Sequence, residues 1–132
     1  MVKDILKTPW PSILWTGLIF ILLSIDTGSL ELASRIPIPL FDKIVHFGIF
    51  GLYAWIILKW RASVSRAGII IAILSFFVSS LYGTAMEFYQ EKFTTREFEL
   101  GDIYADTIGA LVATIGFMAT KSPYGNRGRN QN

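Results

Sequence analysis

The hydrophobic residues of this chain are concentrated in four long stretches, which charged or turn-forming segments separate. The stretches cover residues 10–25, 44–60, 67–89 and 103–120. A bilayer core about 30 Å thick needs on the order of 20 helical residues, so the third stretch has a comfortable length and the others lie near the lower limit. The pattern predicts an all-α integral membrane bundle of four transmembrane helices.

The first stretch also allows a second interpretation, because Lys3 and Lys7 precede an apolar centre in the layout of a secretory signal peptide. The residues that follow it, Ser24, Ile25 and Asp26, contain no small-x-small cleavage site. An uncleaved first helix is therefore the favoured interpretation.

Composition agrees with a membrane location. Apolar residues make up 52% of the 132 residues and charged residues 17%. A water-soluble domain of this size could hardly bury so many apolar side chains. We expect a single transmembrane domain over residues 1–121 and a disordered polar tail over residues 122–132. The chain has no cysteine, which excludes a disulfide framework and a thiolate metal site.

The basic residues predict the orientation of the helices. With four spans, eight of the twelve Lys and Arg residues fall on the side of the termini and four on the other side. By the positive-inside rule both termini are expected in the cytoplasm, and the loops at 26–43 and 91–101 are expected to face outward. The basic residues flank apolar runs and form no single block, so nucleic-acid binding is not expected.

Ionisable and amide side chains lie at one end of the last three predicted helices. Such groups are costly at membrane depth, so they indicate a function or a specific partner. They occur in pairs three or four positions apart, which places both members of a pair on one helical face. All of these helix ends lie on the outer side of the predicted topology. We therefore expect one outward-facing, ligand-binding polar pocket lined by Asp42, Lys43, His46, Glu87, Gln90, Arg96, Asp102 and Asp106.

Most of these residues also have a simpler interpretation. Asp42 could merely cap its helix, and Asp102 and Asp106 could just complement the positive N-terminal end of theirs, an effect of about 0.3–1 kcal/mol. Lys43 could extend toward the lipid headgroups. His46 is favoured as a hydrogen-bonded structural residue over a metal ligand, and no metal or cofactor is expected. Glu87 is hardest to explain structurally, because it follows some twenty largely apolar residues.

Small residues on the predicted helices are expected to allow close contact between helices. They are Gly48, Gly51, Gly83, Gly109, Ala113 and Gly116. Gly109 and Ala113 form a small-xxx-small pair.

In their order and spacing, the motifs at these helix ends resemble those of the VanZ-like family of bacterial membrane proteins. The resemblance covers residues 41–116 and rests on Asp42-Lys43-x-x-His46-Phe47, Tyr82-Gly83-x-x-Met86-Glu87-x-x-Gln90, Arg96, and Asp102-Ile103-x-x-Asp106-Thr107-Ile108-Gly109-Ala110. One position departs from the pattern: the family usually shows Asn where this chain has Asp106, so an amide is replaced by a group that only accepts when ionised.

The resemblance implies a multi-pass protein of the bacterial cytoplasmic (inner) membrane with a role at the cell envelope. Through the founding member of the family, it also implies a link to resistance against the antibiotic teicoplanin. It implies no reaction, and a binding protein is favoured over an enzyme.

Three hypotheses for the function follow. In the first, the pocket binds a membrane lipid headgroup or a cell-envelope precursor, with Lys43 and Arg96 contacting an anion. In the second, the polar residues only stabilise the bundle, which docks to another membrane protein or to a second copy. Transport is not favoured, because four short spans offer little for alternating access unless the chain forms oligomers.

The third hypothesis is a membrane enzyme that acts on phosphorylated lipids. His46 and Glu87 are its candidate catalytic acid and base. Alternatively, His46, Glu87, Asp102 and Asp106 hold a divalent metal that activates water. The spacing of these residues matches no established metal motif.

Overall fold

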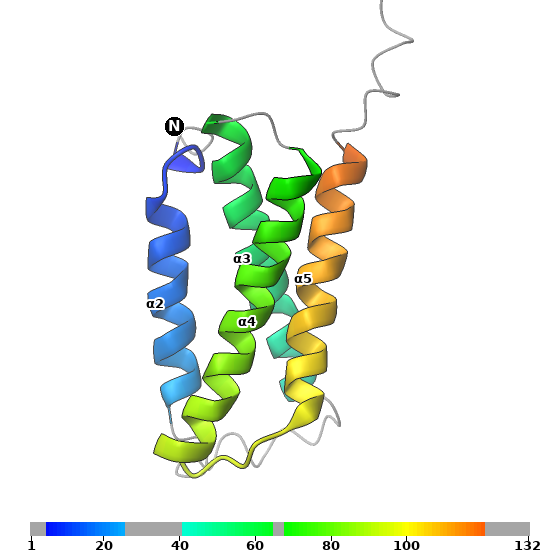
Figure 1. Cartoon of the computed structure of the whole chain (residues 1–132). Helices are drawn as coiled ribbons and strands as arrows, with labels where there is room; N and C mark the ends of the chain where they lie inside the picture. The colour runs from blue at the N-terminus through cyan, green and yellow to red at the C-terminus, as the bar shows by residue number, and fades with distance from the viewer. Residues whose placement is uncertain (1–4, 26–40, 65–67, 121–132) are drawn as a thin grey trace, which may run out of the picture.

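The four apolar stretches form four helices that pack side by side in one bundle (Figure 1). This computed structural model describes residues 5–25, 41–64 and 68–120. The helices are α2 (Trp10–Ser24), α3 (Phe41–Val64), α4 (Ile69–Phe93) and α5 (Leu100–Thr120). The described residues contain no strand, so the all-α prediction is confirmed. The predicted tail at 122–132 and the loop residues 26–40 lie outside the described residues.

The last three helices are longer than the apolar stretches that predicted them. Residues 41–43 belong to α3, residues 90–93 to α4 and residues 100–102 to α5. These polar ends are helical because helix formation depends on backbone hydrogen bonds and does not need continuous apolarity. The three helices have 24, 25 and 21 residues and are long and apolar enough to cross a membrane.

The first helix is shorter than the others. It has 15 residues, about 22 Å of helix against a bilayer core of about 30 Å. Side chain to backbone hydrogen bonds attach it to its neighbours: Trp15 Nε1 donates to the Ile49 carbonyl at 3.0 Å, and Gln90 Nε2 donates to the Leu23 carbonyl at 3.0 Å. Interhelical hydrogen bonds of this kind stabilise helix packing in a bilayer, where the hydrophobic effect contributes little.

Glycines bring the backbones of α3 and α5 into contact. A Cβ atom added at Gly51 would lie 3.0 Å from the Gly109 carbonyl oxygen, and one at Gly109 would collide with the backbone of Phe47. A Cβ at Gly48 or Gly116, in contrast, would meet no described atom within 4 Å. The expectation of close contact is therefore met at Gly51 and Gly109 and is wrong for Gly48 and Gly116, which face open space.

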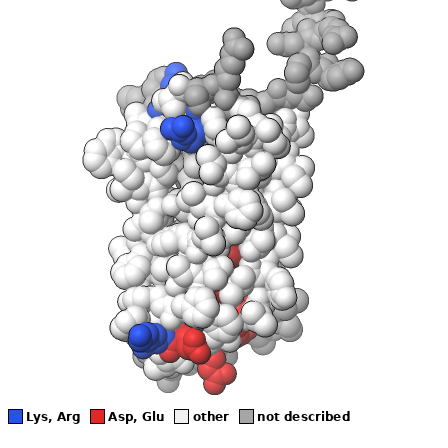
Figure 2. Space-filling view, viewed as in Figure 1, with Lys and Arg blue, Asp and Glu red and all other residues white. Residues whose placement is uncertain are grey.

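The two ends of the bundle differ in character. α2 begins and α5 ends at one end, whereas α4 ends and both α3 and α5 begin at the other (Figure 1). On the face shown in Figure 2, the acidic side chains lie in the half of the molecule where α4 ends and α5 begins. The ionisable residues predicted to meet therefore do lie at the same end of three helices.

Candidate functional site

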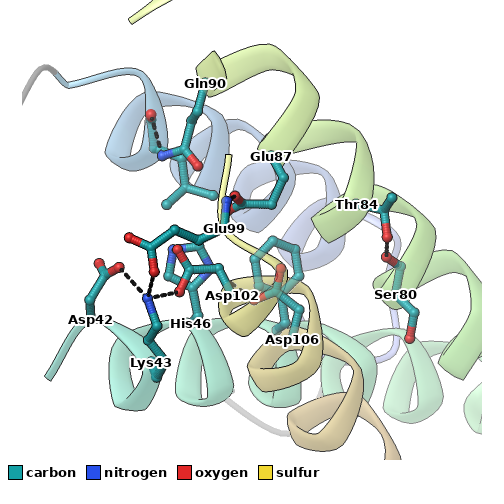
Figure 3. A network of polar contacts seen from close by, with 12 residues as sticks. Asp42, Lys43, His46, Ser80, Thr84, Glu87, Gln90, Glu99, Asp102 and Asp106 are labelled. Atoms are coloured by element: carbon teal, nitrogen blue, oxygen red, sulfur yellow. Dashed lines mark hydrogen bonds and ion pairs between the residues drawn. The ribbon is translucent and has the colours of Figure 1, made fainter. Parts of the chain in front are cut away.

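A group of ionisable side chains meets at the end of the bundle where α3 and α5 begin and α4 ends, and Figure 3 shows those that it labels. α3, α4, α5 and the segment connecting α4 to α5 all contribute to this group, which we call the polar cluster. Its members are Asp42, Lys43, His46, Glu87, Arg96, Glu99, Asp102 and Asp106.

His46 and Asp106 form a buried pair at the centre of the polar cluster. The Nδ1 atom of His46 lies 2.9 Å from Oδ1 of Asp106, and both side chains are 1% exposed. With Asp106 ionised and His46 neutral, Nδ1 donates its N–H to the carboxylate, and Nε2 then keeps its lone pair. Nε2 has no hydrogen-bond partner among the described residues, and it lies 4.0 Å from Oδ2 of Asp102.

Asp106 has room beside α4 because residue 83 is a glycine. A Cβ atom at Gly83 would overlap the Asp106 carboxylate. The glycine therefore lets α4 and α5 approach each other while the carboxylate stays against the His46 ring. Gly83 was predicted to allow close helix contact, and the group that it accommodates is the side chain of Asp106.

Two cations lie on the outer side of the polar cluster, and both are paired with carboxylates. Lys43 Nζ lies 2.8 Å from Asp102 Oδ1 and also pairs with Glu99. Arg96 Nη2 lies 2.8 Å from Asp42 Oδ2 and 3.6 Å from Asp102 Oδ2. These ion pairs join α3 to α5 and to the connecting segment, so Asp42 and Asp102 do more than complement a helix end.

Glu87 is buried, and only part of its hydrogen-bonding capacity is used. Its Oε2 atom accepts the backbone N–H of Glu99 at 3.3 Å, while Oε1 has no partner among the described residues. Gln90, one turn further along α4, lies beside the cluster and donates to the Leu23 carbonyl of α2. Glu87 therefore faces the cluster, and Gln90 connects α4 to the first helix.

Carboxylates outnumber the fixed cations of the polar cluster. Three of the five carboxyl groups, on Glu87, Asp102 and Asp106, are at most 1% exposed. In the part of the chain that the structure describes, Lys43 and Arg96 alone supply permanent positive charge to the cluster. An uncompensated carboxylate is costly in a protein interior, so the excess is compensated by protons, by hydrogen-bond donors or by a further cation.

The outer edge of the cluster is more accessible than its centre. The side chain of Asp42 is 43% exposed, and those of Lys43, Arg96 and Glu99 are also partly exposed. We call these four residues the rim. A cavity of ≈ 380 Å³ lies elsewhere, between α2, α3 and α4, and is lined mainly by apolar residues together with Ser12, Thr16, Tyr53, Arg61 and Ser75.

Seven of the eight residues predicted from the sequence lie in the polar cluster, and Gln90 lies next to it. Glu99 was not predicted from the sequence. It pairs with Lys43, and its backbone N–H donates to Glu87. Its position three residues before Asp102 is the signal that could have found it, since a residue just before a helix lies near the first helical turn.

Comparison with known proteins agrees with the motifs at the cluster. No solved structure matches the chain. An uncharacterized protein of the fission yeast Schizosaccharomyces pombe is 34% identical to it over 98 residues, which cover 74% of this chain and 59% of the relative. The chain thus spans about three fifths of the length of this eukaryotic relative. The family model described as VanZ/LLP1 matches residues 2–121. Because this match includes every helix of the bundle and every member of the polar cluster, the chain belongs to the VanZ/LLP1 family.

Proposed function

We propose that the polar cluster binds the polar headgroup of a membrane lipid or of a lipid-linked cell-envelope precursor. The observation that carries this proposal is the convergence of eight ionisable side chains at one end of three membrane-length helices. Charged groups are rare on such helices and usually mark a binding site or a pathway. The end of a membrane-spanning helix lies at the depth of the lipid headgroups, so headgroups are the ligands closest to the cluster.

The rim can exchange its internal ion pairs for contacts with a ligand. Asp42 and Arg96, which are 43% and 18% exposed, form a pair at the surface of the cluster. Asp42 is exposed enough for water to solvate its carboxylate, so Arg96 can exchange this pair for a contact with a headgroup phosphate. Arg is well suited to this contact because its guanidinium binds phosphate through two parallel hydrogen bonds.

The buried centre of the cluster offers acceptors that the other part of a headgroup would reach once the rim side chains move aside. Oε1 of Glu87 and Oδ2 of Asp106 have no hydrogen-bond partner among the described residues. Hydroxyl or amine groups of a headgroup are donors that match these oxygens. The combination favours a headgroup that carries both a phosphate and hydrogen-bond donors.

The proposal places the polar cluster at the outer face of the cytoplasmic membrane of a bacterium, with both termini in the cytoplasm. It is supported by the excess of Lys and Arg on the side of the termini. The link to teicoplanin resistance that the resemblance implies belongs to the same proposal, through binding of an envelope precursor.

Lipid retention by the purified protein tests the proposal. Glu87→Gln keeps the shape and an acceptor oxygen of the side chain, and Arg96→Gln removes the rim guanidinium. Glu91→Gln, an exposed carboxylate of α4 outside the cluster, is the matched control. We expect native mass spectrometry to show bound phospholipid on the wild type and on Glu91→Gln, and at least a tenfold loss in the two cluster variants.

Equal lipid retention by all four proteins would reject the proposal. If Glu87→Gln and Arg96→Gln fail to fold, as judged by size exclusion and circular dichroism, the cluster serves to stabilise the bundle. That result would favour a structural protein that docks to another membrane protein or to a second copy.

A specific observation favours an enzyme as the second candidate. Asp106 orients the His46 ring through Nδ1 and leaves Nε2 free, which is the arrangement of a general base held by a carboxylate. Such a base could activate water against a phosphorylated lipid. Phosphate release from a polyprenyl phosphate by the wild type, abolished in His46→Gln, would support this activity, and no release would reject it.

A further inference from the structure

We propose that His46, Asp42 and Asp102 form a binding site for a divalent metal cation within the polar cluster. Each of the three side chains offers one ligand atom, and these atoms lie within 4.8 Å of one another. They come from the first two turns of α3 and the first turn of α5. The proposed ion would therefore connect the same two helices that Gly51 and Gly109 bring together.

The geometry of His46 is the second observation that points to an ion. The ring is 1% exposed, and its Nε2 atom has no hydrogen-bond partner among the described residues. A buried ring nitrogen with a free lone pair lacks the partner that buried polar atoms normally have. Nε2 lies toward Asp102, whose Oδ2 atom is 4.0 Å away. This separation is close to twice a metal–ligand bond of about 2.1 Å, so a small movement of the two side chains lets one ion bind both.

Asp106 acts as a positioning residue in this arrangement. Histidines that bind metals usually donate the other ring N–H to a carboxylate, which fixes both the tautomer and the orientation of the ring. The 2.9 Å contact between His46 Nδ1 and Asp106 Oδ1 is such an interaction. In the neutral ring this contact leaves Nε2 unprotonated, which is the state that a metal requires.

The charges of the cluster also favour a cation. Among the described residues, the carboxyl groups of Asp42, Glu87, Glu99, Asp102 and Asp106 face two permanent cations, Lys43 and Arg96. A divalent ion supplies two of the three missing positive charges. Lys43 can release Asp102 to the ion because it also pairs with Glu99. Asp42 becomes available to the ion when Arg96 binds an anionic ligand at the rim.

The donor set selects the kind of ion. One imidazole nitrogen and two carboxylate oxygens suit Mn²⁺ or Zn²⁺, whereas Ca²⁺ and Mg²⁺ prefer oxygen ligands alone. Three protein ligands leave at least one coordination position open. If the proposed headgroup binding is correct, a phosphate oxygen of the headgroup occupies that position while Arg96 binds a second oxygen.

A metal titration without added lipid tests this inference. The full chain is purified in detergent, treated with EDTA, dialysed and titrated with Mn²⁺, and free Mn²⁺ is measured by electron paramagnetic resonance. We expect one saturable site per chain from which Zn²⁺ displaces Mn²⁺. His46→Gln and Asp102→Asn should weaken binding at least tenfold, and the control Glu91→Gln should bind as the wild type does.

Asp42→Asn and Asp106→Ala complete the test. Asp42 is partly exposed, so its amide variant is expected to fold even if the buried variants do not, and it should also weaken binding. Asp106→Ala should weaken binding between tenfold and a hundredfold through loss of ring positioning. Absence of saturable Mn²⁺ binding by the wild type, or equal affinity of the wild type and Asp42→Asn, would overturn the inference.

The two proposals fail in different ways. Lipid retained in EDTA by a protein that does not bind Mn²⁺ would reject the metal site and leave headgroup binding intact. A protein that binds Mn²⁺ but retains no lipid would reject headgroup binding and leave the metal site intact.

Discussion

At the scale of single residues, the position of Asp106 shows how one side chain can satisfy a buried histidine. Its carboxylate accepts from His46 Nδ1, and Gly83 provides the space that it occupies. An asparagine, which the resemblance to VanZ-like proteins leads us to expect at this position, also has an oxygen that could accept the same N–H. Both residues offer this acceptor, and only the aspartate can carry a negative charge.

We predict that Asp106→Asn folds with nearly wild-type stability, whereas Asp106→Leu is destabilised by about 1–3 kcal/mol because the buried N–H of His46 loses its acceptor. Thermal unfolding of the detergent-solubilised proteins, followed by circular dichroism, measures the difference. Equal destabilisation by both substitutions would contradict the role given to the acceptor oxygen.

The residues of the candidate site could largely be predicted from the sequence, but their pairing could not. Spacing along α3 and α5 placed Asp42 with His46 and Asp102 with Asp106, because helical geometry is regular. Lys43 was expected to contact an anionic ligand, which stays a prediction, and its ion pairs with Asp102 and Glu99 were not expected. Such pairings depend on how helices and connecting segments meet in space, which spacing along one helix does not determine.

At the scale of helices, the contact between α3 and α5 holds the polar cluster together. The two backbones touch at Gly51 and Gly109, and Phe47 lies against Gly109. The small-xxx-small spacing singled out Gly109, but it did not distinguish Gly109 from Gly116. Which glycine contacts a neighbour depends on the rotation of the helix in the bundle, and a weak hydrophobic periodicity does not determine that rotation.

Gly109→Ala should therefore destabilise the bundle by about 1–3 kcal/mol, since the added methyl group meets backbone that has no rotamer to change. Gly116→Ala is the matched control on the same helix, where the added methyl group enters open space. Thermal unfolding in detergent compares the two, and a control as unstable as Gly109→Ala would contradict the assigned contact.

At the scale of the whole molecule, the arrangement of the helices was predictable because four long apolar runs have few ways to pack. The prediction of an even number of passes agrees with α2 beginning and α5 ending at the same end (Figure 1). Orientation in the membrane is a separate prediction, which rests on the distribution of basic residues.

Cysteine labelling tests the orientation, because the chain has no cysteine of its own. Glu97→Cys places an exposed thiol at the end of the polar cluster, and Val64→Cys places one at the opposite end. In intact cells a membrane-impermeant maleimide should label Glu97→Cys alone, and after permeabilisation it should label both. Labelling of only Val64→Cys in intact cells would show that the topology is the reverse of the predicted one.

The central claim, that the buried ionisable side chains bind a lipid headgroup, is tested most directly by comparing phospholipid retained by Glu87→Gln with that retained by Glu91→Gln. The two substitutions make the same chemical change on the same helix, one inside the polar cluster and one outside it. We expect loss of lipid from Glu87→Gln alone, and equal retention by the two folded proteins would show that the polar cluster does not bind the headgroup.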